Sequence, residues 1–261
     1  MIDSTTALRT PTSPSSEAPS EAGRLAGRVV RREALSAGER RRLWALLSEH
    51  FADGSRERFE RDLAEKQWVV LVDDPRGEIQ GFSTVQRLET ALDGEPIVAY
   101  FSGDTVIHRD FWGEPILPSL WSRHVFGLAA AEPHRAFWFL ISSGYKTYRF
   151  LPVFFREFFP RWDRPTPARV RRLLDHLGGV KYPSEYDPSA GVVRFRQPMP
   201  LRAGVADLTE TRLRDPHVAF FGAANPGHAR GDELACVTEV HPDNVTPAGR
   251  RMLGLPRTRK Q

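Results

Sequence analysis

A strand–loop–helix–strand–helix order in the middle of the chain constrains its fold more than any other feature. An apolar, strand-like segment at 97–107 leads into a loop at 108–113, and the spacing of apolar residues predicts a helix at 114–131. A nearly continuous apolar run at 136–141 is typical of a strand covered on both faces, and an aromatic-rich helix is expected at 145–159. This order places a helix N-terminus, with its free N–H groups, beside the ends of two strands, where an anionic cofactor can bind.

The length and composition of the chain fit one large domain or a domain with an extension. The chain has 261 residues, of which 40% are hydrophobic, with 16 Phe and 6 Trp, so it can bury a sizeable core. The single cysteine, Cys236, excludes an intrachain disulfide, and the histidines lack metal-ligand spacing. We find no signal peptide and no apolar run of about 18 residues, so we expect a cytoplasmic protein with no metal and no membrane partner.

The charge of the chain is weakly basic, with a formal net charge of +4. Its basic side chains are almost all arginine, and the lysines are Lys66, Lys146, Lys181 and Lys260. The arginines are scattered and interleaved with acidic residues, which is typical of a biased composition; the alternative is an anionic partner such as nucleic acid or a phosphorylated cofactor. Only the short run Arg257, Arg259 and Lys260 resembles a nucleic-acid arm, so we expect no nucleic-acid partner.

The other elements surround this central order. Ser36 and Glu39 have the spacing of a capping box and predict the start of a helix with one buried stripe. Two β-rich runs separated by a turn predict a hairpin after it. The expected elements are helices at 36–51, 55–63 and 166–179, strands at 68–72 and 79–88, and a turn at 91–96.

The composition changes after Val180, where proline and glycine become frequent. The elements expected beyond this point are strands at 192–195, 218–221 and 233–240 and a last short helix from Thr246. This part lacks enough apolar side chains to fold alone. We therefore expect a disordered tail at 1–23, a main domain at 24–180, and a C-terminal extension at 181–261 that packs on the same core.

The order of two helices, a hairpin, a long strand, a helix, a strand and a helix resembles that of the GNAT-like acyltransferase superfamily. The resemblance covers about 27–161 and rests on three local matches: the hairpin segment 74–82 with its Gly-Phe end, the strand-to-loop segment 104–113, and the strand-to-helix segment 137–148. It implies an α/β fold, with a mixed α+β sheet flanked by helices, that here carries a C-terminal β-rich extension.

The resemblance also implies a function. In that family, acyl-CoA lies in a gap between two splayed strands, and an amine attacks its thioester with help from a general base and a tyrosine that protonates the departing thiolate. The family pattern assigns the backbone of Val106 and Ile107 to the pantetheine arm, and the loop at Gly113 with the following helix N-terminus to the pyrophosphate. It therefore implies an acyl-CoA-dependent acyltransferase, N-acetyltransferase-like, with a small-molecule amine as acceptor and acetyl-CoA or another acyl-CoA as donor.

The phosphate loop departs from the family pattern. That pattern has several small residues whose N–H groups approach the phosphates, whereas Gly113 is the only glycine here, Pro115 has no N–H, and Glu114 adds negative charge. Three alternatives follow: a different acyl donor, a modified way of binding CoA, or a catalytically inactive binding or regulatory protein. The sequence does not determine the oligomeric state.

The candidate catalytic residues lie near the ends of the two central strands. His108 is either the general base or a loop histidine, and Asp104 and Glu95 are alternative bases, whose pKa would have to be raised by burial. Tyr145 and Tyr148 share one face of the expected helix. One of them is either the acid for the thiolate or, together with the neighbouring phenylalanines, part of an aromatic core.

Three further residues are candidates for holding the cofactor. Ser142 and Ser143 either present hydroxyl and N–H groups to a ligand or form the turn between strand and helix. Lys146 lies near the expected helix N-terminus, where a cation can contact a phosphate.

Overall fold

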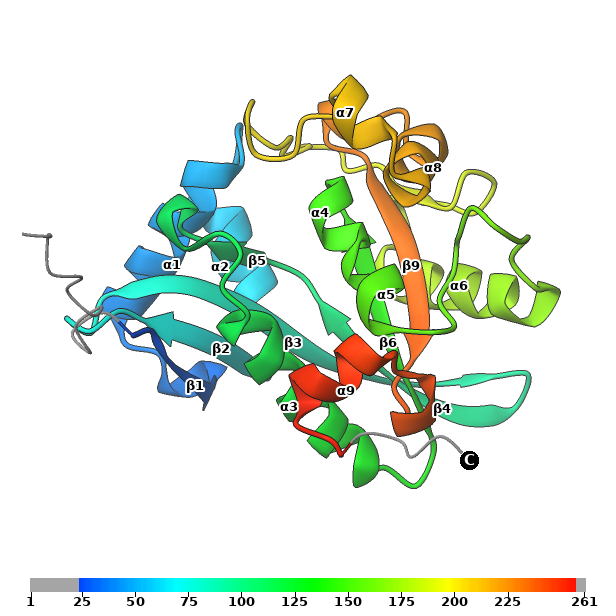
Figure 1. The fold of residues 1–261 in the computed structure, drawn as a ribbon, viewed down its shortest axis with the longest axis horizontal. Helices are drawn as coiled ribbons and strands as arrows, with labels where there is room; N and C mark the ends of the chain where they lie inside the picture. Colours follow the sequence, from blue (N-terminus) through cyan, green and yellow to red (C-terminus); the bar gives the residue numbers. More distant parts are fainter. Residues whose placement is uncertain (1–23, 257–261) are drawn as a thin grey trace, which may run out of the picture.

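The computed structural model of the chain describes residues 24–256; the expected tail at 1–23 and the basic run within 257–261 lie outside them. The described strands form a nine-stranded mixed sheet with the order β1-β2-β3-β4-β6-β9-β8-β7, and β5 pairs with β3. Helices cover both faces of this sheet (Figure 1). The predicted mixed α/β sheet flanked by helices is therefore confirmed.

The order of the elements along the chain is close to the predicted order. The strands are β1 (Ala26–Arg31), β2 (Trp68–Asp73), β3 (Ile79–Leu92), β4 (Glu95–Ser102), β5 (Thr105–Ile107), β6 (Arg135–Ser142), β7 (Tyr186–Asp187), β8 (Val192–Val193) and β9 (Glu233–Glu239). The helices are α1 (Ala37–His50), α2 (Arg56–Ala64), α3 (Ile116–Ala130), α4 (Tyr145–Tyr148), α5 (Phe150–Phe154), α6 (Ala168–Lys181), α7 (Glu210–Leu213), α8 (Pro216–Ala224) and α9 (Pro247–Leu253). The capping box is present, since the Ser36 hydroxyl accepts from the N–H of Glu39 and the Glu39 carboxylate accepts from the N–H of Ser36.

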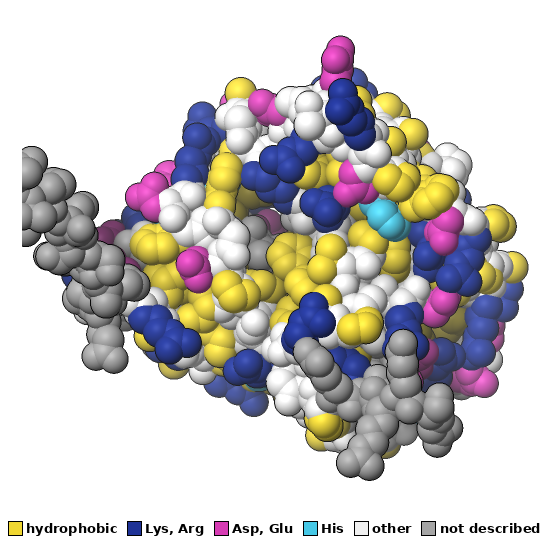
Figure 2. All heavy atoms as spheres, in the orientation of Figure 1, with side chains coloured by type: hydrophobic (Ala, Val, Ile, Leu, Met, Phe, Trp, Pro, Cys, Tyr) yellow, Lys and Arg dark blue, Asp and Glu magenta, His cyan; other side chains and the backbone are white. Residues whose placement is uncertain are grey.

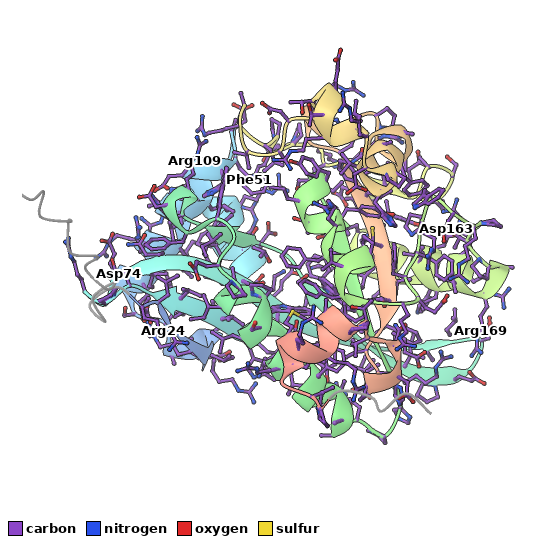
Figure 3. All side chains as sticks on the ribbon, viewed as in Figure 1. Arg24, Phe51, Asp74, Arg109, Asp163 and Arg169 are labelled. Carbon is purple, nitrogen blue, oxygen red and sulfur yellow. The ribbon has the colours of Figure 1, made fainter. Side chains whose placement is uncertain are left out.

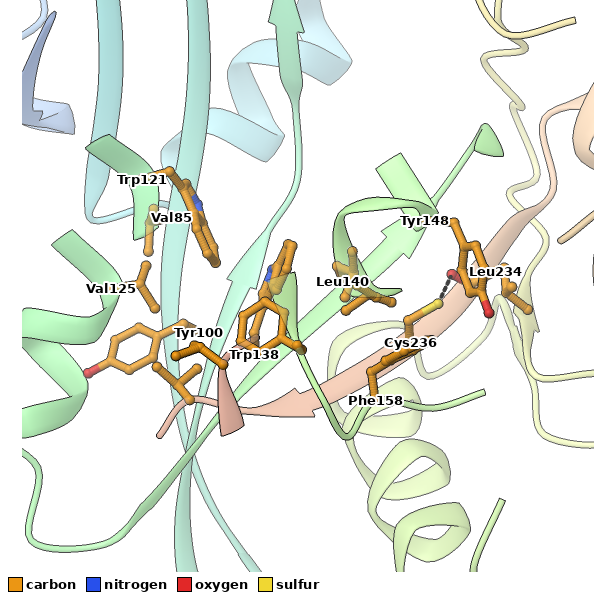
Figure 4. Close-up of a cluster of buried hydrophobic side chains, with 14 of the residues drawn as sticks. Val85, Tyr100, Trp121, Val125, Trp138, Leu140, Tyr148, Phe158, Leu234 and Cys236 are labelled. Carbon is orange, nitrogen blue, oxygen red and sulfur yellow. Dashed lines mark hydrogen bonds between the residues drawn. The ribbon is translucent and has the colours of Figure 1, made fainter. Parts of the chain in front are cut away.

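Each face of the sheet has its own hydrophobic core. On one face, α1 and α2 pack on β2, β3 and β5, and α6 packs on β4, β6 and β9. On the other face, α3, α4, α5, α8 and α9 cover the centre of the sheet. Figure 4 shows part of this second core, in which the Trp121 and Trp138 rings lie 4.5 Å apart between centroids. Two layers of helices therefore enclose the ends of the central strands from both sides.

Strand β9 comes from the residues beyond 180 but lies near the centre of the sheet. It pairs antiparallel with β6, from Phe137 opposite Glu239 to Ser142 opposite Leu234. Of its seven residues, the five between its ends are buried. The ends of β6 and β9 therefore contribute side chains to the same region.

Among residues 24–256, no helix combines the length and the apolar composition needed to span a bilayer.

The predicted strand at 218–221 is wrong, because these residues lie within helix α8. The Asp215 carboxylate accepts from the N–H of His217, and Pro216 occupies the first turn, where its missing N–H costs little. The apolar run Val218 to Phe221 was compatible with either element. The Asp-Pro pair before it was the signal for a helix start.

Two other predicted boundaries change. The helix expected at 145–159 is broken into α4 and α5 and ends at Phe154. The turn expected at 91–96 narrows to two residues, because β3 and β4 pair as far as Leu92 opposite Glu95. Both Asp93 and Gly94 have positive φ, as a two-residue hairpin turn requires.

Candidate active site

The two central parallel strands separate at their carboxyl ends. β4 and β6 pair from Ile97 opposite Arg135 to Ser102 opposite Leu140. Two residues, Gly103 and Asp104, then interrupt the strand, and its continuation β5 pairs only with β3. The end of β6 instead follows β9. A gap therefore opens between β5 and the end of β6.

One edge of β5 faces this gap. The N–H of Thr84 donates to the carbonyl of Asp104, and the N–H of His108 donates to the carbonyl of Gln80, so every second residue of this segment bonds to β3. Between them, the N–H and C=O groups of Thr105 and Ile107 must point away from β3. The Ile107 carbonyl accepts from the indole of Trp112 at 3.1 Å. The remaining groups on this edge are available to an extended ligand.

A cavity of about 880 Å³ fills the gap and reaches both faces of the sheet. Figure 2 shows this side of the molecule hollowed near its centre, with hydrophobic side chains around the hollow. The elements that line the cavity include the 108–115 loop and helices α3, α4, α5 and α9, whose arrangement Figure 1 shows. The apolar wall residues include Leu117, Trp121, Phe150, Phe154 and Met252 on one face of the sheet and Leu47, Phe51, Phe101, Phe195 and Met199 on the other.

The mouth of the cavity is cationic. The ammonium of Lys146, at the start of α4, lies 3.5 Å from the centroid of the Trp112 ring in the 108–115 loop. Burial, together with the positive charges of Arg212 and Arg109, lowers the pKa of Lys146. Arg109 also lies over Trp112, with 5.7 Å between its guanidinium carbon and the ring centroid. Lys146 therefore lines the cavity, and the positive charges of Arg109 and Arg212, which lie outside its lining, act on it, so that the potential there favours an anionic ligand.

The 108–115 loop uses its own N–H groups. The N–H of Phe111 donates to His108, that of Trp112 to Arg109, and that of Glu114 to Phe111, at 2.9, 3.2 and 3.2 Å. Gly113 has a φ of 101° and lines the cavity. These three N–H groups therefore bond within the loop, in contrast to the free N–H groups that the resemblance implies for it.

Two carboxylates line the inner part of the cavity. Asp104 lies at the strand break, and Glu233 lies at the start of β9. Burial raises the pKa of Asp104 to about 6, with the positive charge of Lys66 acting in the opposite direction. Burial raises the pKa of Glu233 to about 7, and a hydrogen bond from Ser143 opposes this shift. Both groups can therefore exchange protons near neutral pH.

The structure brings five of the predicted cofactor residues together at the cavity. These are Val106, Ile107, Gly113, Ser143 and Lys146. Ser142 is different, since it is fully buried beside the cavity and its hydroxyl has no hydrogen-bond partner among the described residues.

The predicted catalytic residues lie elsewhere. His108 is outside the cavity: its Nδ1 accepts from the N–H of Asp110, and its Nε2 lies 3.8 Å from the Glu49 carboxylate. Tyr145 is in the core, as is Tyr148, which Figure 4 shows beside Cys236 and Leu234. The Tyr148 hydroxyl donates to the Pro160 carbonyl at 3.0 Å. Of the groups considered as bases, this placement favours Asp104.

Two glutamates differ from the sequence-based expectation: Glu95, an alternative base, lies outside the cavity, and Glu233, which was not proposed, lines it. Glu95 lies in the hairpin between β3 and β4 and pairs with Arg169 at 2.7 Å, away from the cavity. Glu233 was not considered, because only the pairing of β9 with β6 brings it to the strand ends.

Within residues 24–256, no cluster of three or more His, Cys, Asp and Glu residues has the arrangement to hold a metal ion.

The mixed sheet, the separating parallel pair and the helices on both faces are the arrangement that the resemblance to GNAT-like acyltransferases implies. No protein-family model matches the sequence, and no curated protein matches it. Similar solved structures include a probable N-acyltransferase of unknown function from Enterococcus faecalis, with 16% identity and a TM-score of 0.37. This match covers 48% of the present chain and only 31% of that protein.

Two further similar structures are named as acetyltransferases. A GNAT family N-acetyltransferase from Escherichia coli in complex with CoA has 14% identity and a TM-score of 0.38, and the match covers 51% of this chain and 71% of that one. A Trypanosoma brucei acetyltransferase has 15% identity and a TM-score of 0.38, and the match covers 55% of this chain and 100% of that one. At these values the likeness carries no argument about substrate or activity.

Proposed function

We propose that the protein is an acyl-CoA-dependent acyltransferase that acts on a small-molecule amine. The observation that carries the proposal is the free edge of β5 inside the cavity between a cationic mouth and two inner carboxylates. An acyl-CoA donor needs these features in this order: positive charge for its phosphates, backbone groups for its pantetheine amides, and a basic group beside its thioester.

The donor would lie along β5. Its phosphates would be held at the mouth by Arg109, Lys146 and Arg212, and the amides of its pantetheine arm would bond to the N–H and C=O groups that β5 turns away from β3. This placement brings the thioester to the strand break, beside Asp104. The apolar walls of the cavity exclude water from the reacting carbonyl.

Asp104 would act as the general base. The amine nitrogen attacks the thioester carbonyl carbon and forms a C–N bond, while one N–H proton passes to the Asp104 carboxylate. The tetrahedral intermediate then collapses, the C–S bond breaks, and CoA leaves as a thiolate. The proton on Asp104 passes to the thiolate or to water, which returns the carboxylate to its starting form.

The second candidate function is a GNAT-like binding or regulatory protein without catalysis. The remodelled 108–115 loop favours it, because its N–H groups bond within the loop and Glu114 lies at the cavity. The two candidates differ in what acetyl-CoA does once bound: the enzyme releases free thiol when an amine is added, and the binding protein does not.

A binding assay with matched arginine variants tests the proposal. Acetyl-CoA and longer acyl-CoA donors at millimolar concentration should raise the Tm, because a ligand that binds only the folded state stabilises it. Arg109→Ala should reduce the shift, and Arg169→Ala should leave it unchanged; Figure 3 shows these two residues on opposite sides of the molecule. No shift with any donor would contradict the proposal, and a shift without thiol release across an amine panel would favour the binding protein.

A further inference from the structure

Lys66 is a buried cation at the point where the strands separate. Its side chain lies against the strand break, since a Cβ added to Gly103 would lie 3.4 Å from Lys66 Cε. The residue is only 4% exposed, it lines the cavity, and its ammonium lies 5.0 Å from the centroid of the Phe101 ring. Among residues 24–256, no carboxylate lies within ion-pair distance of this ammonium.

Lys181, which lines the same cavity, provides a comparison with Lys66. Its ammonium lies 5.1 Å from the centroid of the same Phe101 ring, but it pairs with the Glu65 carboxylate. One ammonium beside this ring therefore has an ion-pair partner, whereas the other interacts with carboxylates, chiefly Asp104, only at longer range, and burial lowers its pKa to about 8. A buried charge without a counter-ion costs free energy, and an anionic ligand removes that cost.

A second polar group beside Lys66 also lacks a partner. The hydroxyl of Thr84 is fully buried, has no hydrogen-bond partner among the described residues, and lies 3.4 Å from the same added Cβ position at Gly103. Arg58 cannot replace Lys66 as an anion site, because its guanidinium donates to the Gln197 carbonyl and lies over the Phe195 ring. At the strand break, the ammonium without an ion-pair partner among the described residues is therefore that of Lys66.

We infer that Lys66 binds a carboxylate of the acceptor, so that the acceptor is an amine that also carries a carboxylate, such as an α-amino acid. The amine end of this acceptor would face Asp104 and Glu233, which line the same cavity. A single ammonium next to two carboxylates matches a monoanion better than a doubly charged phosphate, which the carboxylates would repel. The inference that this carboxylate belongs to an acceptor rests on the proposed acyl transfer; an anion site at Lys66 does not.

Matched acceptors test this inference. Thiol release from acetyl-CoA is measured with L-leucine against 3-methylbutylamine, and with L-phenylalanine against 2-phenylethylamine, pairs that differ only in the carboxylate. The wild-type protein should prefer the carboxylated member by about tenfold or more in kcat/KM, as a charge-assisted contact provides. Lys66→Met should remove this preference, because KM for the carboxylated member should rise relative to KM for its plain amine, whereas Lys181→Met should retain the preference.

A second measurement does not depend on catalysis. N-acetyl-L-leucine should raise the Tm of the wild-type protein but not that of Lys66→Met, and N-(3-methylbutyl)acetamide should raise neither. Lys66→Met should itself fold, because methionine fills a similar volume without a buried charge. Inorganic phosphate serves as the competing anion.

The outcomes separate the inference from the proposed function. Equal turnover of both members of each pair, with a normal rate, leaves the acyltransferase intact and overturns the carboxylate site. If no amine supports thiol release, the thermal shifts decide: a shift with N-acetyl-L-leucine that is lost in Lys66→Met supports the carboxylate site. A shift with phosphate alone, or no shift at all, overturns it.

Discussion

The Lys146 ammonium lies 3.5 Å from the centroid of the Trp112 ring, so that the 108–115 loop and helix α4 meet across the mouth of the cavity. The Trp112 indole also donates to the Ile107 carbonyl, on the edge of β5 that faces the cavity. One side chain therefore contacts both the cationic entrance and the strand along which the donor would lie. This links binding of the donor to the position of the loop.

Trp112→Ala should weaken acyl-CoA binding. The substitution removes the ring that orients Lys146 and frees the Ile107 carbonyl, and the cation–π contact alone corresponds to about 0.5–2 kcal/mol, or roughly twofold to thirtyfold in Kd. Calorimetric titration with CoA measures this change. Trp162→Ala is the matched control, since Trp162 is 52% exposed and lies outside the cavity. Equal affinities for the two variants would contradict the role of Trp112.

Asp104→Asn should lower kcat by about a hundredfold or more, because asparagine cannot accept a proton from the amine. In the wild-type protein, turnover should increase as pH rises through about 6, where the Asp104 carboxyl loses its proton. The groups that act on this pKa are Lys66, Asp62, Arg58 and Lys181. An activity profile that is flat from pH 5 to about 8 would rule out Asp104 as the base.

The same substitution should stabilise the protein above pH 6. Because burial raises the pKa of Asp104 in the folded state, the folded protein binds more protons than the unfolded chain between about pH 4 and 6, and its stability falls as pH rises through that window. Asp104→Asn removes this loss. Its free energy of unfolding should exceed that of the wild-type protein by roughly 1–3 kcal/mol at pH 8, and the difference should shrink below about pH 4. Denaturant unfolding at both pH values measures it.

Tyr148→Phe separates a structural from a catalytic role. The buried Tyr148 hydroxyl donates to the Pro160 carbonyl, so its removal should cost about 1–2 kcal/mol of stability. Thiol release per folded molecule should stay within about twofold of the wild-type rate. A much larger fall in kcat with an unchanged Tm would restore the tyrosine as the acid for the thiolate.

Local signals made much of the fold predictable. Ser36 and Glu39 set the start of α1, and the apolar run before Ser142 indicated a central strand covered on both faces. The order of these elements was enough to predict where two strands would separate. The prediction depended on neighbouring residues in the chain, and it was reliable where such short-range signals were strong.

The site was predictable only in part. Val106, Ile107 and Lys146 line the cavity, where the element order places them, and their role as cofactor residues stays a prediction. Lys66 and Glu233 were missed, since the sequence does not show that a residue just after α2 and one at the start of β9 line the same cavity. His108 is one residue beyond β5, where its N–H still bonds to β3 but its imidazole lies near Glu49 of α1.

Hydrogen–deuterium exchange of residues 103–108, with and without CoA, tests the central claim most directly. If the pantetheine arm pairs with the free edge of β5, saturating CoA should slow exchange of the Thr105 and Ile107 amides, which do not bond to β3, while the amides of His108 and Thr84, which already bond across the β3–β5 pair, change little. Bound CoA without added protection at Thr105 and Ile107 would contradict this account of the site.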